Sequence, residues 1–137
     1  MTCLPVLAED SGLEVTALKG RPGIYSARYA GPKSTAEECL RKILREMAGQ
    51  NNRDCRFVAV LALAKQGVLI RIFRGTVKGI LTRKKKGRSG FGYDPVFFFP
   101  PAGKTFAEMT VKEKNTVSHR AKVLSAFREY YEIKGLS

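Results

Sequence analysis

Residues 55–79 read CRFVAVLALAKQGVLIRIFRGTVKG, and this stretch decides the fold. It holds two runs rich in β-branched and aromatic residues, which favour extended strands. Between the runs stand Gln66 and Gly67, a two-residue spacing typical of a tight turn between antiparallel strands. The stretch therefore predicts a β-hairpin whose second strand ends near Gly75 or Gly79.

An amphipathic helix is expected before this hairpin. Residues 32–50 read PKSTAEECLRKILREMAGQ and place Ser34 and Glu37 at the spacing of a capping box. Apolar residues then recur at helical spacing up to Gly49, where we expect the helix to stop.

The sequence after the hairpin predicts one more strand, at residues 96–99, and one more helix, starting near Val117. Four residues of that helix fall on one face, which we expect to pack on the sheet: Ala121, Leu124, Phe127 and Tyr131. Strands and helices are interspersed over residues 1–137 without a linker or repeat. We therefore expect a single α/β domain with a mixed β-sheet and flanking helices.

The N-terminal stretch places acidic residues between two extended segments. Residues 5–18 read PVLAEDSGLEVTAL. We expect a short buried strand at residues 6–8, an acidic turn from Glu9 to Gly12 and a second extended segment from Leu13.

Composition excludes several classes of protein. With 137 residues, 44% of them hydrophobic, the chain can bury a core and is not expected to be disordered. No apolar run has the length of a membrane span, and the first ten residues, MTCLPVLAED, lack the pattern of a signal peptide, so we expect a cytoplasmic location. The three cysteines form no C-x-x-C pair, which argues against a disulfide framework and a zinc site.

The formal net charge of +13 predicts a phosphate-bearing partner, which could be a nucleic acid, a membrane surface or a small nucleotide. Charge alone does not choose among them. The densest basic run, TRKKKGR at residues 82–88, is either a solvated loop or a nucleic-acid patch.

Two adjacent acids, Glu9 and Asp10, stand just before Ser11 and Gly12. Carboxylates at a strand end suit Mg²⁺, which prefers oxygen ligands and shares its coordination shell with water and substrate phosphate. The alternative is an ordinary polar turn in which Asp10 accepts hydrogen bonds from backbone N–H groups.

Residues 90–100, GFGYDPVFFFP, combine the features of a nucleotide pocket. The glycines let the backbone approach a ligand, Phe91 and Tyr93 offer flat faces for a base, and Asp94 can accept N–H donors. The alternative is that both aromatics belong to the core around a tight turn.

His119 is the only histidine and stands beside Arg120 at a predicted helix start. The pair could bind an anion or hydrogen-bond to a ligand, although taken alone the histidine is interpreted as a surface residue on a solvated turn. A Ser-His-Asp triad could be assembled from Ser11, His119 and Asp94, but the G-x-S-x-G elbow that exposes such a nucleophile is missing.

Five blocks appear in a specific order: AEDSGLEV, GRPGIYSARYAG, SGFGYDPVFFFP, GKTFAEMTVKEKN and SHRAKVL. Together they closely resemble the inosine triphosphate pyrophosphatase family, whose members are also called XTP/dITP diphosphatases. The resemblance extends over essentially the whole chain.

The resemblance implies Mg²⁺-dependent hydrolysis of ITP, dITP and XTP to the monophosphate and pyrophosphate, by a homodimer with an elongated mixed sheet and a cleft between two lobes. Asp10 matches the second acid of the family's D-D-S-G block, so it would be the general base and a metal ligand, and Glu9 would be a second metal ligand. The implied substrate-binding residues are Ser11, Phe91, Gly92, Tyr93, Asp94, Lys114, His119 and Arg120.

One part of the family pattern has no match. Members begin with a strand and a T/S-x-N-x-x-K loop that grips the triphosphate, whereas here Met1 stands shortly before the acidic block. We therefore expect an N-terminally truncated fold with the base-reading part of the pocket and weak or no pyrophosphatase activity by itself. Two other hypotheses are a basic nucleic-acid-binding module that uses Phe91, Tyr93 and residues 83–88, and a remnant that associates through an exposed sheet edge.

Overall fold

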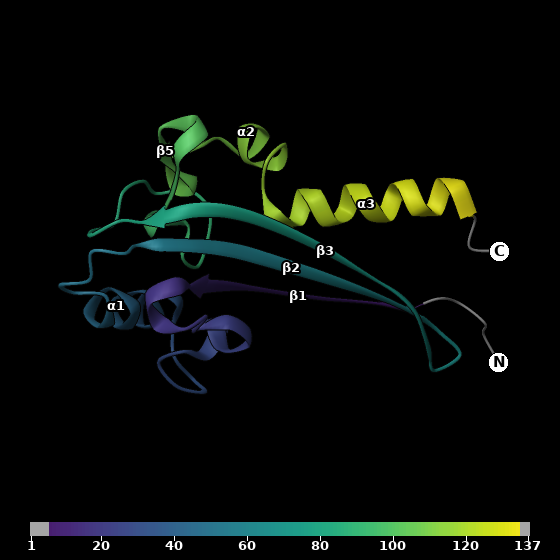
Figure 1. Ribbon diagram of the computed structural model, residues 1–137, viewed down its shortest axis with the longest axis horizontal. Helices are drawn as coiled ribbons and strands as arrows, with labels where there is room; N and C mark the ends of the chain where they lie inside the picture. The colour runs from purple at the N-terminus through teal and green to yellow at the C-terminus, as the bar shows by residue number, and fades with distance from the viewer. Residues whose placement is uncertain (1–5, 135–137) are drawn as a thin grey trace.

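A computed structural model describes residues 6–134 (Figure 1). Its five-stranded sheet has the order β1-β2-β3-β4-β5, with an antiparallel pairing at each of the four junctions. The strands are β1 (Val6–Val15), β2 (Asp54–Lys65), β3 (Val68–Leu81), β4 (Phe97–Phe99) and β5 (Lys104–Thr105). The helices are α1 (Ala36–Glu46), α2 (Val111–Asn115) and α3 (His119–Lys134), and short 3₁₀ turns include Gly23–Arg28. The α/β class is confirmed, and the sheet is antiparallel at each of these junctions where a mixed sheet was expected.

The hairpin of β2 and β3 is confirmed. Gln66 and Gly67 both have positive φ, 52° and 76°, which is the backbone shape that matches the twist of two antiparallel strands. The second strand runs further than predicted, to Leu81. Its pairing with β4 through Ile80 and Leu81 carries it past the glycines that suggested an earlier end.

The expected acidic turn at residues 9–12 is wrong. β1 is one continuous strand that pairs with β2 from Val6 to Val15. This pairing satisfies the backbone N–H and C=O groups that face β2 and overrides the local turn preference. The residues expected as a buried strand also differ, since Val6 is 63% exposed.

We call the region around α1, β4 and β5 the lobe; it occupies the end of the long strands drawn at the left in Figure 1. Apolar side chains from one face of the sheet meet α1 there in a large core. Its fully buried members include Leu13, Val15, Leu40, Ile43, Met47, Leu81, Phe97 and Phe106. The lobe is thus a conventional helix-on-sheet core.

We call the other half of the long strands, with α3 lying along it, the arm (Figure 1). Its core is small: buried Ala59, Leu61, Leu63, Phe73 and Val123, with Ala126, Phe127 and Tyr130 packed against them. Only Phe127 of the predicted helical face belongs to this cluster, while Leu124 and Tyr131 are half exposed. The predicted face of this helix is therefore mostly wrong, although the helix itself is confirmed.

The capping box of α1 is displaced by one residue from the prediction. Thr35 accepts from the Glu38 backbone N–H, and the Glu38 side chain accepts from Thr35 N–H, each at 3.1 Å. Ser34 instead donates its hydroxyl to the Gly31 carbonyl. The helix ends at Glu46, before Gly49.

Two contacts fix the start of α3 on β3. A side chain at Gly75 would place its Cβ 2.6 Å from the His119 carbonyl oxygen, so only glycine leaves room for the helix backbone. Lys122 Nζ donates to the Thr76 carbonyl at 2.9 Å.

None of the helices between residues 6 and 134 has the length and apolarity needed to cross a bilayer.

Candidate nucleotide-binding site at the junction of lobe and arm

The turn at residues 90–94 is held together from inside by Asp94. This carboxylate is 2% exposed, accepts from the Phe91 backbone N–H at 3.1 Å and forms an ion pair with Lys114. Gly90 has φ of 79°, and a side chain there would collide with the Asp94 carboxylate. Asp94 thus orients both Phe91 and Lys114 while lining the adjoining cavity.

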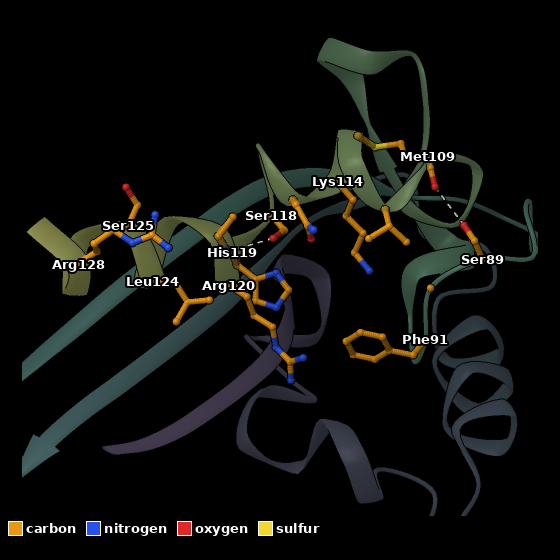
Figure 2. A pocket seen from close by; sticks show the side chains of 14 residues that line it. Ser89, Phe91, Met109, Lys114, Ser118, His119, Arg120, Leu124, Ser125 and Arg128 are labelled. Carbon is orange, nitrogen blue, oxygen red and sulfur yellow. Dashed lines mark hydrogen bonds between the residues drawn. The ribbon is translucent and has the colours of Figure 1, made fainter. Parts of the chain in front are cut away.

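The two aromatics of this turn have different environments. Tyr93 is buried in the lobe core, where it donates its hydroxyl to the Ser26 carbonyl at 2.7 Å and burial raises its pKa. Phe91 is 60% exposed, and its ring lies open beside the cavity in Figure 2. The core interpretation therefore describes Tyr93, whereas Phe91 is free to stack on a planar ligand.

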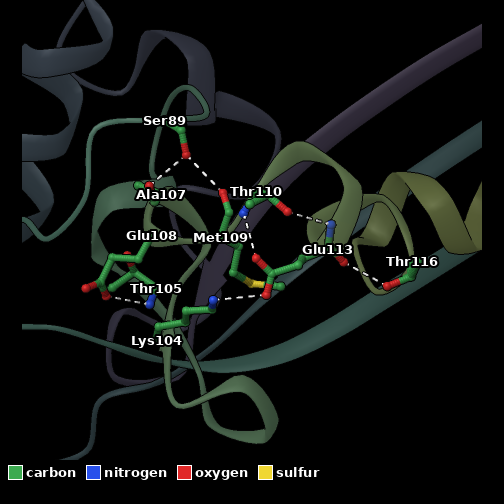
Figure 3. A network of polar contacts seen from close by, with 9 residues as sticks. All are labelled: Ser89, Lys104, Thr105, Ala107, Glu108, Met109, Thr110, Glu113 and Thr116. Atoms are coloured by element: carbon green, nitrogen blue, oxygen red, sulfur yellow. Dashed lines mark hydrogen bonds and ion pairs between the residues drawn. The ribbon is translucent and has the colours of Figure 1, made fainter.

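Lys114 is placed by a chain of capping interactions before α3 (Figure 3). Thr105 with Glu108 and Thr110 with Glu113 form two consecutive capping boxes, and Lys104 pairs with Glu113 at 2.9 Å. Hydrogen bonds to Thr110, followed by the pairing with Lys104, hold the pKa of Glu113 at about 2. The short segment that carries Lys114 is therefore anchored by side-chain hydrogen bonds.

Two cations lie against the exposed ring. Lys114 Nζ is 4.7 Å and Arg120 Cζ is 5.0 Å from the centroid of Phe91. Arg120 also forms an ion pair with Glu9, with Nε and Oε1 3.0 Å apart. Positive charge is thus concentrated at the exposed aromatic of the 90–94 turn.

His119 is a buried residue, so its interpretation as a surface histidine is wrong. It is 5% exposed and its ring stacks on Phe57 with centroids 4.6 Å apart. Its Nε2 lies 2.6 Å from Ser11 Oγ, and its Nδ1 has no partner among the described residues. Burial, followed by the charges of Arg120 and Lys114, lowers the pKa of His119 to about 4.

The structure brings together two members of the Ser-His-Asp arrangement but not the third. Ser11 and His119 are hydrogen-bonded, whereas Asp94 is engaged by Lys114 and Phe91. The imidazole therefore lacks the carboxylate that would stabilise a protonated ring, which argues against a nucleophilic triad.

Two cavities flank the ring of Phe91. One of about 340 Å³ lies between β1, the 90–94 turn and the start of α3, and its lining includes Ser11, Gly92, Asp94 and His119. The other, of about 600 Å³, follows α3, and Lys114 and Arg128 line it (Figure 2). Phe91, His119 and Arg120 line both. Cavities of this size suit a small-molecule ligand.

The structure does not bring Asp10 together with these residues. Consecutive side chains of a strand point to opposite faces, so Glu9 and Ser11 face α3 while Asp10 faces the other side. There Asp10 lines a shallow hollow of about 150 Å³ with Val60 and Arg74. Ser11 and Gly12 line both this hollow and the 340 Å³ cavity, so β1 separates the two by the width of one strand.

Glu9 and Asp10 do not fit one shared metal ion, since they lie on opposite faces and Glu9 is paired with Arg120. Residues 6–134 contain no group of three His, Cys, Asp or Glu side chains that could hold a metal. Of these two acids, Asp10 is the one without an ion pair among the described residues, and it is exposed. One carboxylate is a sufficient protein contribution for Mg²⁺ when phosphate and water complete its coordination.

The sequence interpretation missed Phe57 and Ser26. Phe57 supports the imidazole, and Ser26 accepts from Tyr93 while its hydroxyl accepts from Leu13 N–H. Phe57 has only the signal of an inward-facing strand residue. That signal identifies core residues and does not identify which side chain they support.

Comparison with known proteins identifies the family of the chain. A model of the Ham1 family matches residues 1–130. The chain belongs to the Ham1 family. The Ham1 relatives include the "dITP/XTP pyrophosphatase" of Thermus thermophilus, 49% identical over 96% of this chain and 64% of that protein, and that of Staphylococcus epidermidis, 44% identical over 93% and 65%.

Solved Ham1 structures have the same fold. The Ham1 protein of Staphylococcus aureus superposes on this chain with a TM-score of 0.91 at 39% identity. The match covers 95% of this chain and 68% of the Staphylococcus aureus protein. The HAM1 protein of Coxiella burnetii has a TM-score of 0.89 at 38% identity, with 96% and 68% covered. The chain spans somewhat less than two thirds of the length of the two curated relatives.

Proposed function

We propose that this Ham1 chain binds non-standard purine nucleoside triphosphates, namely ITP, dITP and XTP, and takes part in their hydrolysis to the monophosphate and pyrophosphate. The observation that carries the proposal is the convergence of Phe91, Lys114, His119 and Arg120 on two adjoining cavities. The names of the two curated relatives supply the reaction and the substrate class.

The arrangement of the site suits a purine base. The exposed ring of Phe91 can stack on the base. Asp94 fixes both the Phe91 backbone and the Lys114 ammonium through its carboxylate. Hydrogen bonds that reward a 6-oxo group and leave a 6-amino group unpaired would discriminate ITP from ATP, because a buried unpaired polar group is costly.

The triphosphate would cross the edge of β1 toward Asp10. β1 is the edge strand, and Ser11 and Gly12 border the hollows on both faces. In the proposed reaction a water oxygen bonds to the α-phosphorus, the α–β phosphoanhydride bond breaks and pyrophosphate leaves. Asp10 would orient the water and accept its proton.

We further propose that Mg²⁺ is held by Asp10 together with the substrate phosphates. The ion would neutralise charge on the triphosphate while water attacks. Glu9 is not proposed as a ligand of this ion, because it forms an ion pair with Arg120 on the other face of the strand.

The expected catalytic rate is low. Asp10 shares its hollow with one cation, Arg74, whereas a triphosphate carries several negative charges that need partners. We also propose a cytoplasmic homodimer for the functional protein, which size-exclusion chromatography with light scattering and cell fractionation would test.

The test is turnover of ITP, dITP, XTP and ATP by purified protein with and without Mg²⁺, alongside binding measured by isothermal titration. We expect ITP to bind more tightly than ATP, with turnover more than tenfold below that of a full-length relative. Arg120→Ala should weaken ITP binding by about tenfold, since it removes a charge-assisted contact. Equal, steeply salt-dependent binding of ITP, ATP and single-stranded RNA would instead indicate a nucleic-acid module.

A further inference from the structure

The hydrogen bond between Ser11 and His119 leaves open which atom carries the shared proton. A hydroxyl can donate or accept, and a neutral imidazole carries one N–H. Either Ser11 donates to Nε2, and Nδ1 carries the ring proton, or Nε2–H donates to Ser11 Oγ, and Nδ1 is a bare lone pair. The two states differ in what they leave buried at Nδ1, which has no partner among the described residues.

The charge around the ring distinguishes these two states. Lys114 and Arg120 both act on His119, and the residue is the first of the 16-residue helix α3, where the helix dipole is positive. Two acids on this side of β1 are engaged, Asp94 by Lys114 and Glu9 by Arg120, while Asp10 lies on the other face of the strand. A positive potential favours an unpaired lone pair at Nδ1 over an unpaired N–H donor.

We infer that His119 donates Nε2–H to Ser11 Oγ and thereby leaves the Ser11 hydroxyl proton free to be donated toward the cavity. With one lone pair of Ser11 engaged by the ring, its O–H points away from the imidazole into the 340 Å³ cavity that Ser11 lines. Ser11 can then donate to a ligand acceptor such as a keto oxygen, whereas in the other state its proton is held by Nε2 and Ser11 can only accept.

His119 is in this view a positioning residue that acts through Ser11. Its ring is almost completely buried against Phe57, which restricts its rotation and so holds Nε2 toward the strand. The selection of the keto group rests on the proposed function, whereas the position of the ring proton does not.

The first test is the tautomer of the ligand-free protein. His119 is the only histidine, so long-range ¹H–¹⁵N correlation of labelled protein gives one pair of imidazole nitrogen signals. We expect a protonated Nε2 and a bare Nδ1 at pH 7. A protonated Nδ1 with a bare Nε2 would overturn the inference whatever nucleotides bind.

The second test compares ITP with ATP in binding experiments. Ser11→Ala should weaken ITP binding by about tenfold and leave ATP binding unchanged, so the preference for ITP falls. Ser11→Thr keeps the hydroxyl and should restore most of that preference. Ser34→Ala is the matched control, because it removes a hydroxyl that donates to a backbone carbonyl and lines neither cavity.

A third test separates positioning from structural support. His119→Phe keeps a flat ring against Phe57 and removes Nε2–H, so no partner directs the hydroxyl proton of Ser11 toward the cavity. We expect a folded protein whose ITP preference falls about as far as in Ser11→Ala. An unchanged preference in a folded His119→Phe protein would overturn the positioning role. Failure of the wild type to bind ITP, with Nε2 protonated, would instead defeat the proposed function and the keto selection that rests on it.

Discussion

The lobe and the arm are built from the same three long strands, yet they are stabilised differently. In the lobe, α1 and the aromatics of β4 and the turn after β5 close over one face of the sheet, and sixteen of the described residues are buried in this core. In the arm, α3 packs on that face, and five residues of the described part of the chain form the buried core. Residues near the hairpin tip such as Val68 and Leu69 are more than half exposed. Stability is therefore concentrated at one end, and the candidate site lies where the two ends meet.

The largest effect is expected for a cavity in the lobe. Phe97 is fully buried and contacts Phe57 and Phe106, with ring centroids 4.3 and 4.7 Å apart. Phe97→Ala should lower the free energy of unfolding by about 3–5 kcal/mol, measured by urea denaturation. Phe98→Ala, at the neighbouring and less buried position, is the control. Equal losses would contradict a core centred on Phe97.

The junction should respond to pH through His119. Its folded-state pKa of about 4 lies below its ordinary 6.5, so protonation favours the unfolded chain. The stability that depends on a neutral imidazole is fully present above pH 6.5. It is lost as the pH falls toward 4, by at most about 3 kcal/mol. Urea unfolding at several pH values should show a shallower pH dependence for His119→Phe than for the wild type. Parallel curves would mean that the imidazole titrates normally.

The arm should be sensitive to the face of α3 that packs on the sheet. Val123 is 1% exposed and Leu124 is 51% exposed. Val123→Ala should cost about 2 kcal/mol and speed hydrogen exchange along α3, because it removes buried methyl groups from a small core. Leu124→Ala should change stability by less than about 0.5 kcal/mol. A larger loss of stability for Leu124→Ala than for Val123→Ala would support the helical face that the sequence predicted.

The smallest effect concerns the entry to α1. Thr35→Ala removes the hydroxyl that caps the helix and should cost about 1 kcal/mol in thermal or urea unfolding. Ser34→Ala should cost less, since that hydroxyl donates to the Gly31 carbonyl outside the helix and otherwise contacts only the Cys39 sulfur, without capping a backbone N–H. A larger loss of stability for Ser34→Ala than for Thr35→Ala would indicate that Ser34 caps the helix, as the sequence predicted.

The sequence predicted the elements that depend on local pattern. The hairpin followed from two β-rich runs around Gln66 and Gly67, and α1 followed from its helical period. The capping box could not be placed to the residue, because Ser34 with Glu37 and Thr35 with Glu38 satisfy the same spacing. The face of α3 was missed for a similar reason: Val123 and Leu124 are adjacent, and only the sheet decides which is covered.

The sequence indicated several residues that the structure brings together, but it did not indicate their geometry. The quoted blocks identified Phe91, Lys114, His119 and Arg120, which the structure brings to adjoining cavities. The misplaced turn at residues 9–12 kept Glu9 and Asp10 together, whereas a continuous strand separates them by alternation. That strand depends on pairing with β2 more than forty residues away, which no local pattern reveals. The roles of all these residues in binding or catalysis stay predictions, as do those of Asp10, Ser11 and Gly92.

The absence of a side chain at Gly75 also determines which contacts the segment before α3 has to supply. Since the backbone of His119 rests on β3 and Lys122 reaches the carbonyl of Thr76, the height of the imidazole above the sheet is set by the strand. The segment at residues 110–117 does not have to supply that register, so its capping interactions are left to place Lys114 beside Asp94.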